Sequence, residues 1–338
     1  MQVGQIVAEV MKREGVKVLL TYPLNPLTEF AAQADIRPIV VRQERVGVHM
    51  ADAIARLTSG DTVGVFACQG GPGIENAFGA VAQAWSEGVP MVVFPSDAGS
   101  FIKPAFSATL NYQHITKHCE IVTNPGQVVA ALRRAFSIAR NGRPGPVLLE
   151  IAGLWRTEVP GELDYTPTAR ILSAPNPADV DRAAAELVAA KKPLIYAGQG
   201  IHYAKAWNEL KAVAELLEAP VCTSLEGKSA FPETHALALG SGGPTMSNAV
   251  STWVRESDVV FGAGASFSST GFGIRFPTQN KAFIHNTNHE YDINKNIPAK
   301  HALLGDSKLA LAMLHEALQD RLKRPRGLTR QVQADIKT

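Results

Sequence analysis

Short apolar runs and amphipathic segments alternate along almost the whole chain. Residues 1–15, 46–57 and 74–85 carry apolar side chains at the spacing of helices. Compact apolar runs instead predict short buried strands, at 16–20, 39–41, 193–197 and 258–261. Strands that alternate with helices are typical of parallel sheets. The pattern therefore predicts an α/β fold with two doubly wound, mostly parallel-sheet domains.

A proline-rich stretch separates the two halves of the chain. Residues 155–177 contain four prolines and little periodicity, which is typical of a linker. We therefore expect a first domain, a linker, a second domain and a basic tail, at 1–154, 155–175, 176–318 and 319–338.

Composition indicates an ordinary globular protein. The 338 residues carry a formal charge of +2, and 46% of them are hydrophobic. No run approaches the ~18 apolar residues of a membrane span, and the N-terminus does not read as a signal peptide, so a cytoplasmic protein is expected. Cys68, Cys119 and Cys222 are odd in number and lack metal-ligand spacing, so neither a disulfide scaffold nor a metal site is predicted.

Glu44 is the strongest candidate for chemistry. It follows the apolar run 39–41 and precedes the helical pattern 46–57, so it lies at a strand-to-helix junction. The carboxyl ends of strands in α/β sheets are where ligands bind, and partial burial would suit a carboxyl to sharing a proton. The alternative interpretation is a helix-initiating glutamate that complements the helix dipole.

The turn Gly71-Pro72-Gly73 is the second candidate. Glycine lets the backbone approach a ligand closely, and proline fixes φ, so the turn could present its carbonyl groups to a ligand. The alternative is an ordinary strand-to-helix turn. His49, in the helix after Glu44, is interpreted as a packed helix residue, and Cys68 as a small buried hydrophobe.

Several segments resemble one family. Residues 42–56, RQERVGVHMADAIAR, resemble the segment of thiamine-diphosphate enzymes of the acetolactate synthase and 2-hydroxyacyl-CoA lyase type that carries their cofactor-activating glutamate. Gly71-Pro72-Gly73 with Asn76 resembles the family's GPG-x-x-N segment, and residues 142–148 resemble the run that closes its first domain. Beyond residue 175 the chain is similar to the family's middle domain.

The resemblance implies roles for individual residues. In the family the glutamate bonds a ring nitrogen of the cofactor's aminopyrimidine, which makes Glu44 the expected catalytic residue. The pyrimidine-binding residues implied by the resemblance are Pro23, Gly71, Pro72, Gly73 and Asn76. Leu24 stands where the family usually has glycine after the proline. The family's Phe-Gln-Glu segment is not found in 96–117, and Gln113 and His114 are the remaining candidates for the substrate pocket.

The family's third domain has no recognisable counterpart in the sequence. That domain holds Mg²⁺ on the cofactor diphosphate through a Gly-Asp-Gly motif, whereas here Gly60-Asp61 continues into Thr62 and Gly305-Asp306 into Ser307. We therefore expect a separate partner subunit with the diphosphate-binding domain, in a hetero-oligomer of two or more copies. The basic tail, with Arg321 and Lys323, lacks aromatic residues, so it predicts a linker remnant or docking tail rather than a nucleic-acid site.

The function implied is one subunit of a split thiamine-diphosphate enzyme that cleaves or forms a carbon–carbon bond next to a carbonyl. The substrate would be a 2-oxo acid or a 2-hydroxyacyl compound, including coenzyme A thioesters. The alternative is a noncatalytic regulatory or binding subunit that keeps the fold. The turns Gly198-Gln199-Gly200 and Gly262-Ala263-Gly264 would suit FAD, ADP or a coenzyme A portion, but each lacks the third glycine of a dinucleotide fingerprint, and tight structural turns are the preferred interpretation.

Overall fold

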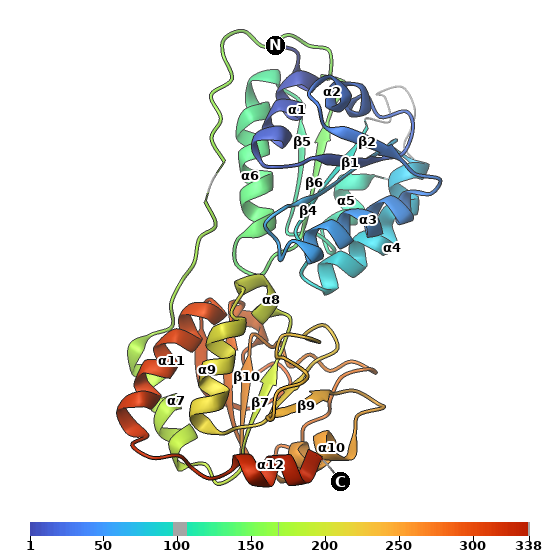
Figure 1. The fold of residues 1–338 in the computed structure, drawn as a ribbon. Coiled ribbons are helices and arrows are strands. Elements are labelled where there is room, and N and C mark those ends of the chain that lie inside the picture. Colours follow the sequence, from blue (N-terminus) through green and yellow to red (C-terminus); the bar gives the residue numbers. More distant parts are fainter. Residues whose placement is uncertain (97–106, 168, 337–338) are drawn as a thin grey trace. The chain divides into compact units, whose positions relative to one another are not determined.

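The computed structural model describes residues 1–96, 107–167 and 169–336. The chain forms two compact α/β units, Met1–Ile171 and Leu172–Thr338 (Figure 1). Each unit contains its own parallel sheet with helices packed against it. This arrangement confirms the fold class expected from the alternation of apolar runs and amphipathic segments.

The sheet of the first unit has six parallel strands within the described residues. In spatial order they are β2 (Arg37–Val40), β1 (Val18–Thr21), β3 (Gly64–Cys68), β4 (Met91–Pro95), β6 (Pro146–Ile151) and β5 (His118–Val122). The three central strands β3, β4 and β6 are almost entirely buried, as expected for a sheet covered on both faces.

Helices cover both faces of this sheet. One buried core contains residues of α1 (Val3–Arg13), α2 (Leu27–Gln33) and α6 (Val128–Arg140). A second core, on the other face, contains residues of α3 (Glu44–Leu57), α4 (Pro72–Ser86) and α5 (Ala108–Tyr112). A short 3₁₀ helix, η1 (Pro125–Gln127), precedes α6. The helix patterns read at 1–15, 46–57 and 74–85 correspond to α1, α3 and α4.

The expectation of a buried strand at 39–41 is wrong in one respect. The strand is β2, which ends at Val40, and it lies at the edge of the sheet, paired with β1. Val40 is 59% exposed, and Ile39 is only partly buried. A short apolar run cannot distinguish a central strand from an edge strand, because both have the same composition. The strand still leads directly to Glu44.

The predicted linker begins as part of the first unit. Trp155 and Tyr165 are only 5% and 4% exposed and belong to its core. The Tyr165 hydroxyl donates a hydrogen bond to the carboxylate of Glu14, which also accepts from Arg140. These contacts hold residues 155–165 against the first unit, which extends to Ile171.

The second unit also has six parallel strands within the described residues. Their spatial order is β12 (Ala299–Leu304), β11 (Ala282–Thr287), β10 (Val259–Ala263), β7 (Pro193–Ala197), β8 (Val221–Thr223) and β9 (Ala238–Ser241). Its helices are α7 (Pro177–Ala189), α8 (Gly200–Ala204), α9 (Trp207–Leu217), α10 (Asn248–Glu256), η2 (Glu290–Asp292), α11 (Ser307–Arg321) and α12 (Thr329–Ile336).

The described part of the basic tail packs against its own unit. Val332 of α12 is fully buried, and Trp253 Nε1 donates a 3.1 Å hydrogen bond to Asp335 Oδ2. Arg326 Nη1 donates to the carbonyl oxygen of Leu187 at 2.9 Å. At least one arginine of the basic tail, Arg326, therefore contacts the rest of the second unit.

Candidate functional site

The candidate site lies where the order of strands in the first sheet reverses. From β1 the chain passes first to β2 on one side and then to β3 on the other. The loops after β1 and β3 therefore lead to opposite faces of the sheet, and α/β folds bind ligands at such reversals of strand order. Residues 22–26 follow β1, Glu44 follows β2, and Gly71 follows β3. The backbone N–H of Tyr22 donates a 2.9 Å hydrogen bond to the carbonyl oxygen of Ala67 in β3, which holds the loop after β1 beside β3.

Glu44 occupies the first position of α3 and is only 6% exposed. Gln43 before it is extended, with φ −143°, so the chain turns directly from strand into helix. At this position the carboxylate lies near the unpaired N–H groups of the first turn, which favour negative charge. Both interpretations of Glu44 are thus compatible with its place, but the helix dipole alone does not require burial of the side chain.

Asn76 holds the Glu44 carboxylate. Its Nδ2 donates a hydrogen bond to Oε2 of Glu44, and its Oδ1 accepts from Arg45 Nη2 at 3.0 Å. Asn76 lies in the first half of α4, so the bond joins the helix that follows β2 to the helix that follows β3. The structure therefore brings together the two polar residues of the two sequence motifs.

The turn before α4 combines one open position with one tightly packed position. Gly71 has φ +61°, a conformation that glycine adopts readily, and a Cβ added there would have no atom within 4 Å. Pro72 takes the first helical position, where its missing N–H costs nothing. A Cβ on Gly73 would lie 2.7 Å from Gln69 Cγ and 3.3 Å from Glu44 Oε1. Glycine at 73 thus lets the backbone of the turn lie close to the Glu44 carboxylate, while one side of Gly71 is open. The role of the turn as a wall of the cofactor site stays a prediction.

Cys68 lies beneath this turn, at the end of β3, and is completely buried. Burial raises the pKa of its thiol, and the nearby Glu44 carboxylate raises this pKa further. The thiol is therefore kept protonated and behaves as a small apolar side chain, as the sequence suggested.

The loop after β1 departs from the family pattern. Pro23 and Leu24 are both exposed, and Leu24 adopts φ +73° at the place where a glycine is usual in the family. Asn25 behind them is buried, and its Nδ2 donates to the carbonyl oxygens of Cys68 and Phe94 at 2.8 and 2.9 Å. This amide ties the loop to the ends of β3 and β4. Sequence reasoning missed it, because an asparagine between two prolines reads as an ordinary turn residue.

Gln113 and His114, the predicted pocket residues, lie just after α5 and are exposed. The buried residue there is Tyr112, whose hydroxyl donates to the Ile74 carbonyl oxygen at 2.5 Å and whose ring packs edge-to-face on Phe78, 5.3 Å between centroids. Tyr112 thus supports the first turn of α4. A role for Gln113 and His114 in the pocket stays a prediction, and no signal in the sequence distinguished Tyr112 from them.

His49 is exposed on α3, because its position in the helix faces away from the sheet. Its interpretation as a packed helix residue is therefore wrong.

Among the described residues, no three or more His, Cys, Asp or Glu side chains cluster in a way that could hold a metal ion. No helix in the described ranges is long and apolar enough to cross a membrane.

The glycine turns of the second unit pack tightly against each other. A Cβ on Gly198 would lie 2.4 Å from the carbonyl oxygen of Gly264, and one on Gly200 would lie 2.8 Å from its Cα. The N–H groups of Gly198 and Gly200 donate at 2.9 Å to the carbonyl oxygens of Ala263 and Gly264. Close backbone packing accounts for these glycines, so FAD, ADP or coenzyme A in this unit stays a prediction without support.

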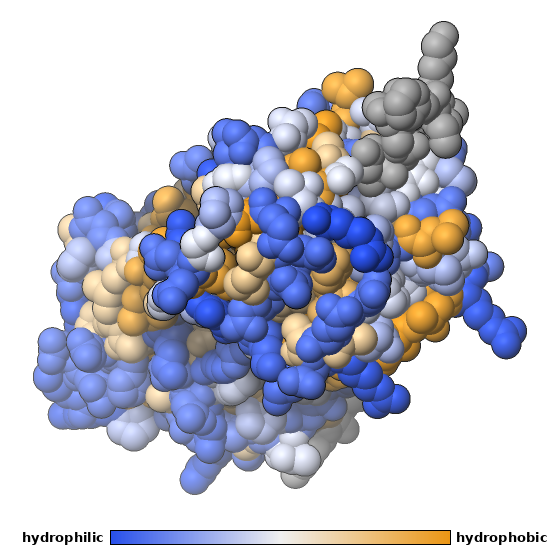
Figure 2. All heavy atoms as spheres, turned by 90° about the horizontal axis from the view of Figure 1, so that it is seen from above, coloured by the Kyte–Doolittle hydropathy of each residue, from blue (hydrophilic) through white to orange (hydrophobic). Residues whose placement is uncertain are grey.

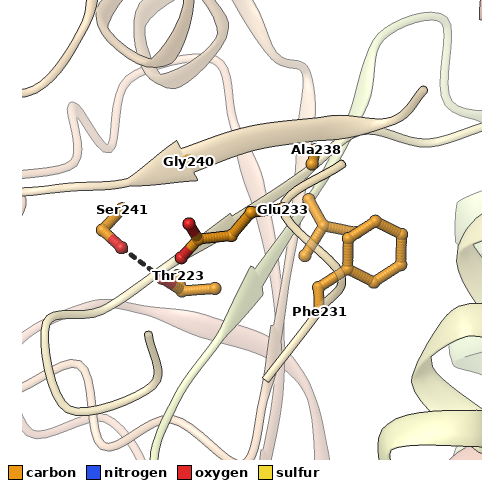
Figure 3. Close-up of a pocket in the computed structure, with 7 residues that line it drawn as sticks. Thr223, Phe231, Glu233, Ala238, Gly240 and Ser241 are labelled. Carbon is orange, nitrogen blue, oxygen red and sulfur yellow. Dashed lines mark hydrogen bonds between the residues drawn. The ribbon is translucent and has the colours of Figure 1, made fainter. Parts of the chain in front are cut away.

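A small pocket in the second unit lies beside the edge strand β9 (Figure 3). The Thr223 and Ser241 hydroxyls form a 3.0 Å hydrogen bond between β8 and β9. The Glu233 carboxylate accepts a 2.6 Å hydrogen bond from Lys228 Nζ. The residues that line the pocket are Val221, Thr223, Phe231, Glu233, Ala238, Gly240 and Ser241. The two hydroxyls are bonded to each other and the carboxylate is paired with a lysine, so we assign no function to this pocket.

Two family profiles match the chain. The profile described as "Thiamine pyrophosphate enzyme, N-terminal TPP binding domain" matches residues 1–115, and "Thiamine pyrophosphate enzyme, central domain" matches residues 180–314. The first match contains Glu44 and the turn before α4, and the second lies within the second unit.

Curated relatives are named as acetolactate synthase large subunits. The chain is 30% identical to the probable large subunit of Methanocaldococcus jannaschii, over 94% of this chain and 56% of the relative. It is 30% identical to the isozyme 3 large subunit of Escherichia coli, over 93% of this chain and 57% of the relative. The chain thus spans little more than half the length of these relatives.

Solved structures share the fold. Benzoylformate decarboxylase from Polynucleobacter necessarius superposes with a TM-score of 0.81 at 22% identity, over 97% of this chain and 63% of that chain. A putative thiamin diphosphate-dependent enzyme from Mycobacterium smegmatis gives a TM-score of 0.82 at 23% identity, over 97% and 64%. Together with the two matching profiles and the curated relatives, this shows that the chain belongs to the thiamine pyrophosphate enzymes and contains their N-terminal TPP-binding domain and their central domain.

Proposed function

We propose that this chain is the pyrimidine-binding part of a thiamine-diphosphate enzyme that cleaves or forms a carbon–carbon bond next to a carbonyl. The observation that carries the proposal is the buried Glu44 carboxylate, held by Asn76 beside the open Gly71–Gly73 turn. When bound, the cofactor supplies the carbanion chemistry, while the protein supplies binding and orientation.

Glu44 is the residue that we propose to be catalytic. A carboxylate can accept a hydrogen bond or share a proton with a ring nitrogen, and its fixed place at the start of α3 removes the entropic cost of orienting it. Pro23, Gly71, Pro72 and Gly73 would frame the pyrimidine. Pro23 and Pro72 are exposed and Gly71 is partly exposed, and these residues follow the neighbouring strands β1 and β3.

The diphosphate requires a second domain. Neither matching profile describes a diphosphate-binding domain, and the chain spans 56–57% of the two relatives described above. A diphosphate needs compensation by a metal ion and N–H donors. We propose that a partner subunit supplies these groups with Mg²⁺, and that the active site forms in a hetero-oligomer.

The substrate class follows from the same proposal. The curated relatives carry the name acetolactate synthase. We propose that the substrate of this enzyme is a 2-oxo acid or a 2-hydroxyacyl compound, including coenzyme A thioesters. The competing function is a noncatalytic subunit that keeps the fold. Burial of Glu44 favours catalysis, because an unneeded buried carboxylate costs free energy.

Native mass spectrometry tests the assembly. The chain would be purified together with the product of its neighbouring gene and incubated with thiamine diphosphate and Mg²⁺. We expect a mixed oligomer that retains one cofactor per copy of this chain. Homo-oligomers that bind no cofactor under the same conditions would contradict the proposal of a split enzyme with that partner.

A further inference from the structure

The two oxygens of the Glu44 carboxylate have different surroundings. Oε2 accepts the hydrogen bond of Asn76. Oε1 lies on the side of the Gly71–Gly73 turn, 3.3 Å from the position of a Cβ on Gly73, and no hydrogen bond to it is recorded among the described residues. One oxygen is therefore fixed by the protein, and the other faces the turn that lines the candidate site.

The orientation of the Asn76 amide is set by Arg45. A guanidinium group can only donate hydrogen bonds, so the amide oxygen must face Arg45, at 3.0 Å. The NH₂ group of Asn76 then faces Glu44, which as a carboxylate can only accept. If the amide rotated by half a turn, its oxygen would oppose the carboxylate and its NH₂ group would oppose the guanidinium. Arg45 thus selects the orientation in which Asn76 can hold Glu44.

The position of Arg45 is unusual in itself. It lies in the first turn of α3, where the helix dipole disfavours a positive charge. Its side chain is exposed, and its recorded hydrogen bond is the one to Asn76. The local cost of a cation at a helix N-terminus is consistent with a specific role for this bond.

We infer that Arg45 and Asn76 are positioning residues, which fix Oε2 of Glu44 and leave Oε1 as the oxygen that meets the cofactor. This inference rests on the proposed function of Glu44. It also revises the expected role of Asn76: the amide oxygen and an amide hydrogen are already used within the protein, so Asn76 acts through Glu44 rather than as a wall of the pyrimidine site.

Nuclear magnetic resonance of the chain alone, without a partner, tests the two hydrogen bonds that join Arg45 to Asn76 and Asn76 to Glu44. The side-chain amide of Asn76 would be observed in ¹⁵N-labelled protein. We expect Glu44→Gln and Arg45→Gln each to shift this signal and to speed its exchange with water. Arg42→Gln removes an equal charge two residues before Glu44, at an exposed arginine, and should leave the signal in place. An Asn76 signal that is insensitive to Glu44→Gln and Arg45→Gln would overturn the inference.

Exchange of the thiazolium proton of thiamine diphosphate tests the consequence in the assembled enzyme. We expect Asn76→Ala to slow this exchange about tenfold or more, since small displacements of a catalytic group are costly. The dissociation constant of the cofactor should change by less than about threefold, because a positioning residue does not contribute to cofactor binding. Weaker cofactor binding with an unchanged exchange rate would instead make Asn76 a direct cofactor contact and overturn the inference.

The Glu44→Gln variant separates the two proposals. If Glu44→Gln slows proton exchange and Asn76→Ala does not, the positioning role alone fails. If Glu44→Gln itself leaves the exchange rate unchanged, the proposed function of Glu44 fails.

Discussion

The side-chain amide of Asn76 donates a hydrogen bond to the carboxylate of Glu44, although the two residues are 32 positions apart in the chain. Glu44 begins the helix after the edge strand β2, and Asn76 belongs to the helix after the central strand β3. The bond therefore fixes a buried carboxylate at the point where the strand order of the first sheet reverses. Such points are where α/β folds bind ligands.

Gly73 should tolerate no side chain. An added Cβ would lie 2.7 Å from Gln69 Cγ and 3.3 Å from Glu44 Oε1, so Gly73→Ala is expected to lower the free energy of unfolding by about 1–3 kcal/mol. Gly79, in the same helix, is the matched control, because a Cβ there would meet nothing within 4 Å. Gly79→Ala should raise the free energy of unfolding by about 0.5–1 kcal/mol. Urea unfolding of the chain measures both, and equal effects would contradict the packing described.

Stability should rise with pH because of Lys117. Burial lowers the pKa of this lysine from 10.5 to about 8, and its Nζ donates to the Asn141 carbonyl oxygen at 2.5 Å. Between these two values the unfolded chain binds a proton that the folded chain has released, so the free energy of unfolding increases with pH. Below pH 8 both states are protonated, and the contribution of Lys117 is constant.

Urea unfolding of wild type and Lys117→Met at several pH values measures this contribution. The difference in unfolding free energy between them should change in favour of wild type from pH 8 towards 10.5. Lys17→Met, at an exposed lysine, is the control. A difference that stays flat across this range for Lys117→Met would show that Lys117 keeps its proton in the folded chain.

The ion pair between Arg140 and Glu14 should matter for stability. The Glu14 side chain is 1% exposed and that of Arg140 is 13% exposed. Arg140→Met leaves Glu14 buried without its cation and should cost about 3–5 kcal/mol of unfolding free energy. Arg156 pairs with Glu29 at 3.0 Å, but these side chains are 71% and 54% exposed, so Arg156→Met should cost at most about 1 kcal/mol. Similar losses from the two variants would contradict the difference in burial.

Much of the fold could be predicted from the sequence. The strand at 193–197 is found as β7, because a compact apolar run of strand length predicts a buried strand, and the helix at 46–57 is found as α3, because its apolar residues recur at helical spacing. The placement of β2 at an edge could not be predicted, because a short apolar run carries no information on its neighbours in the sheet. Nor could the packing of Tyr165 on Glu14, which depends on residues about 150 positions apart.

The candidate site was predicted only in part. Glu44 and the glycine turn were singled out because their segments resemble motifs of the family, and the structure places them after strands β2 and β3 of the first sheet; their roles stay predictions. Asn25 and Tyr112 were missed, because their hydrogen bonds go to backbone carbonyl oxygens of Cys68 and Ile74, and backbone acceptors leave no signature in a sequence.

Exposed apolar side chains are also part of the first unit. Val46, Met50 and Leu57 on α3 are 45%, 36% and 87% exposed. Figure 2 shows one face of the molecule, on which orange hydrophobic residues gather in several places among more numerous hydrophilic ones. Surface apolar residues of this kind are common in globular proteins.

The most direct test of the account is the rate of thiazolium proton exchange in thiamine diphosphate bound to the complete assembly, compared between wild type and Glu44→Gln. Removing a catalytic acid or base typically costs about 10²–10⁴-fold, so we expect a loss in that range. Glu75→Gln, at an exposed carboxylate in the first turn of α4, should retain the wild-type rate. An exchange rate in Glu44→Gln equal to that of wild type would contradict the claim that Glu44 activates the cofactor.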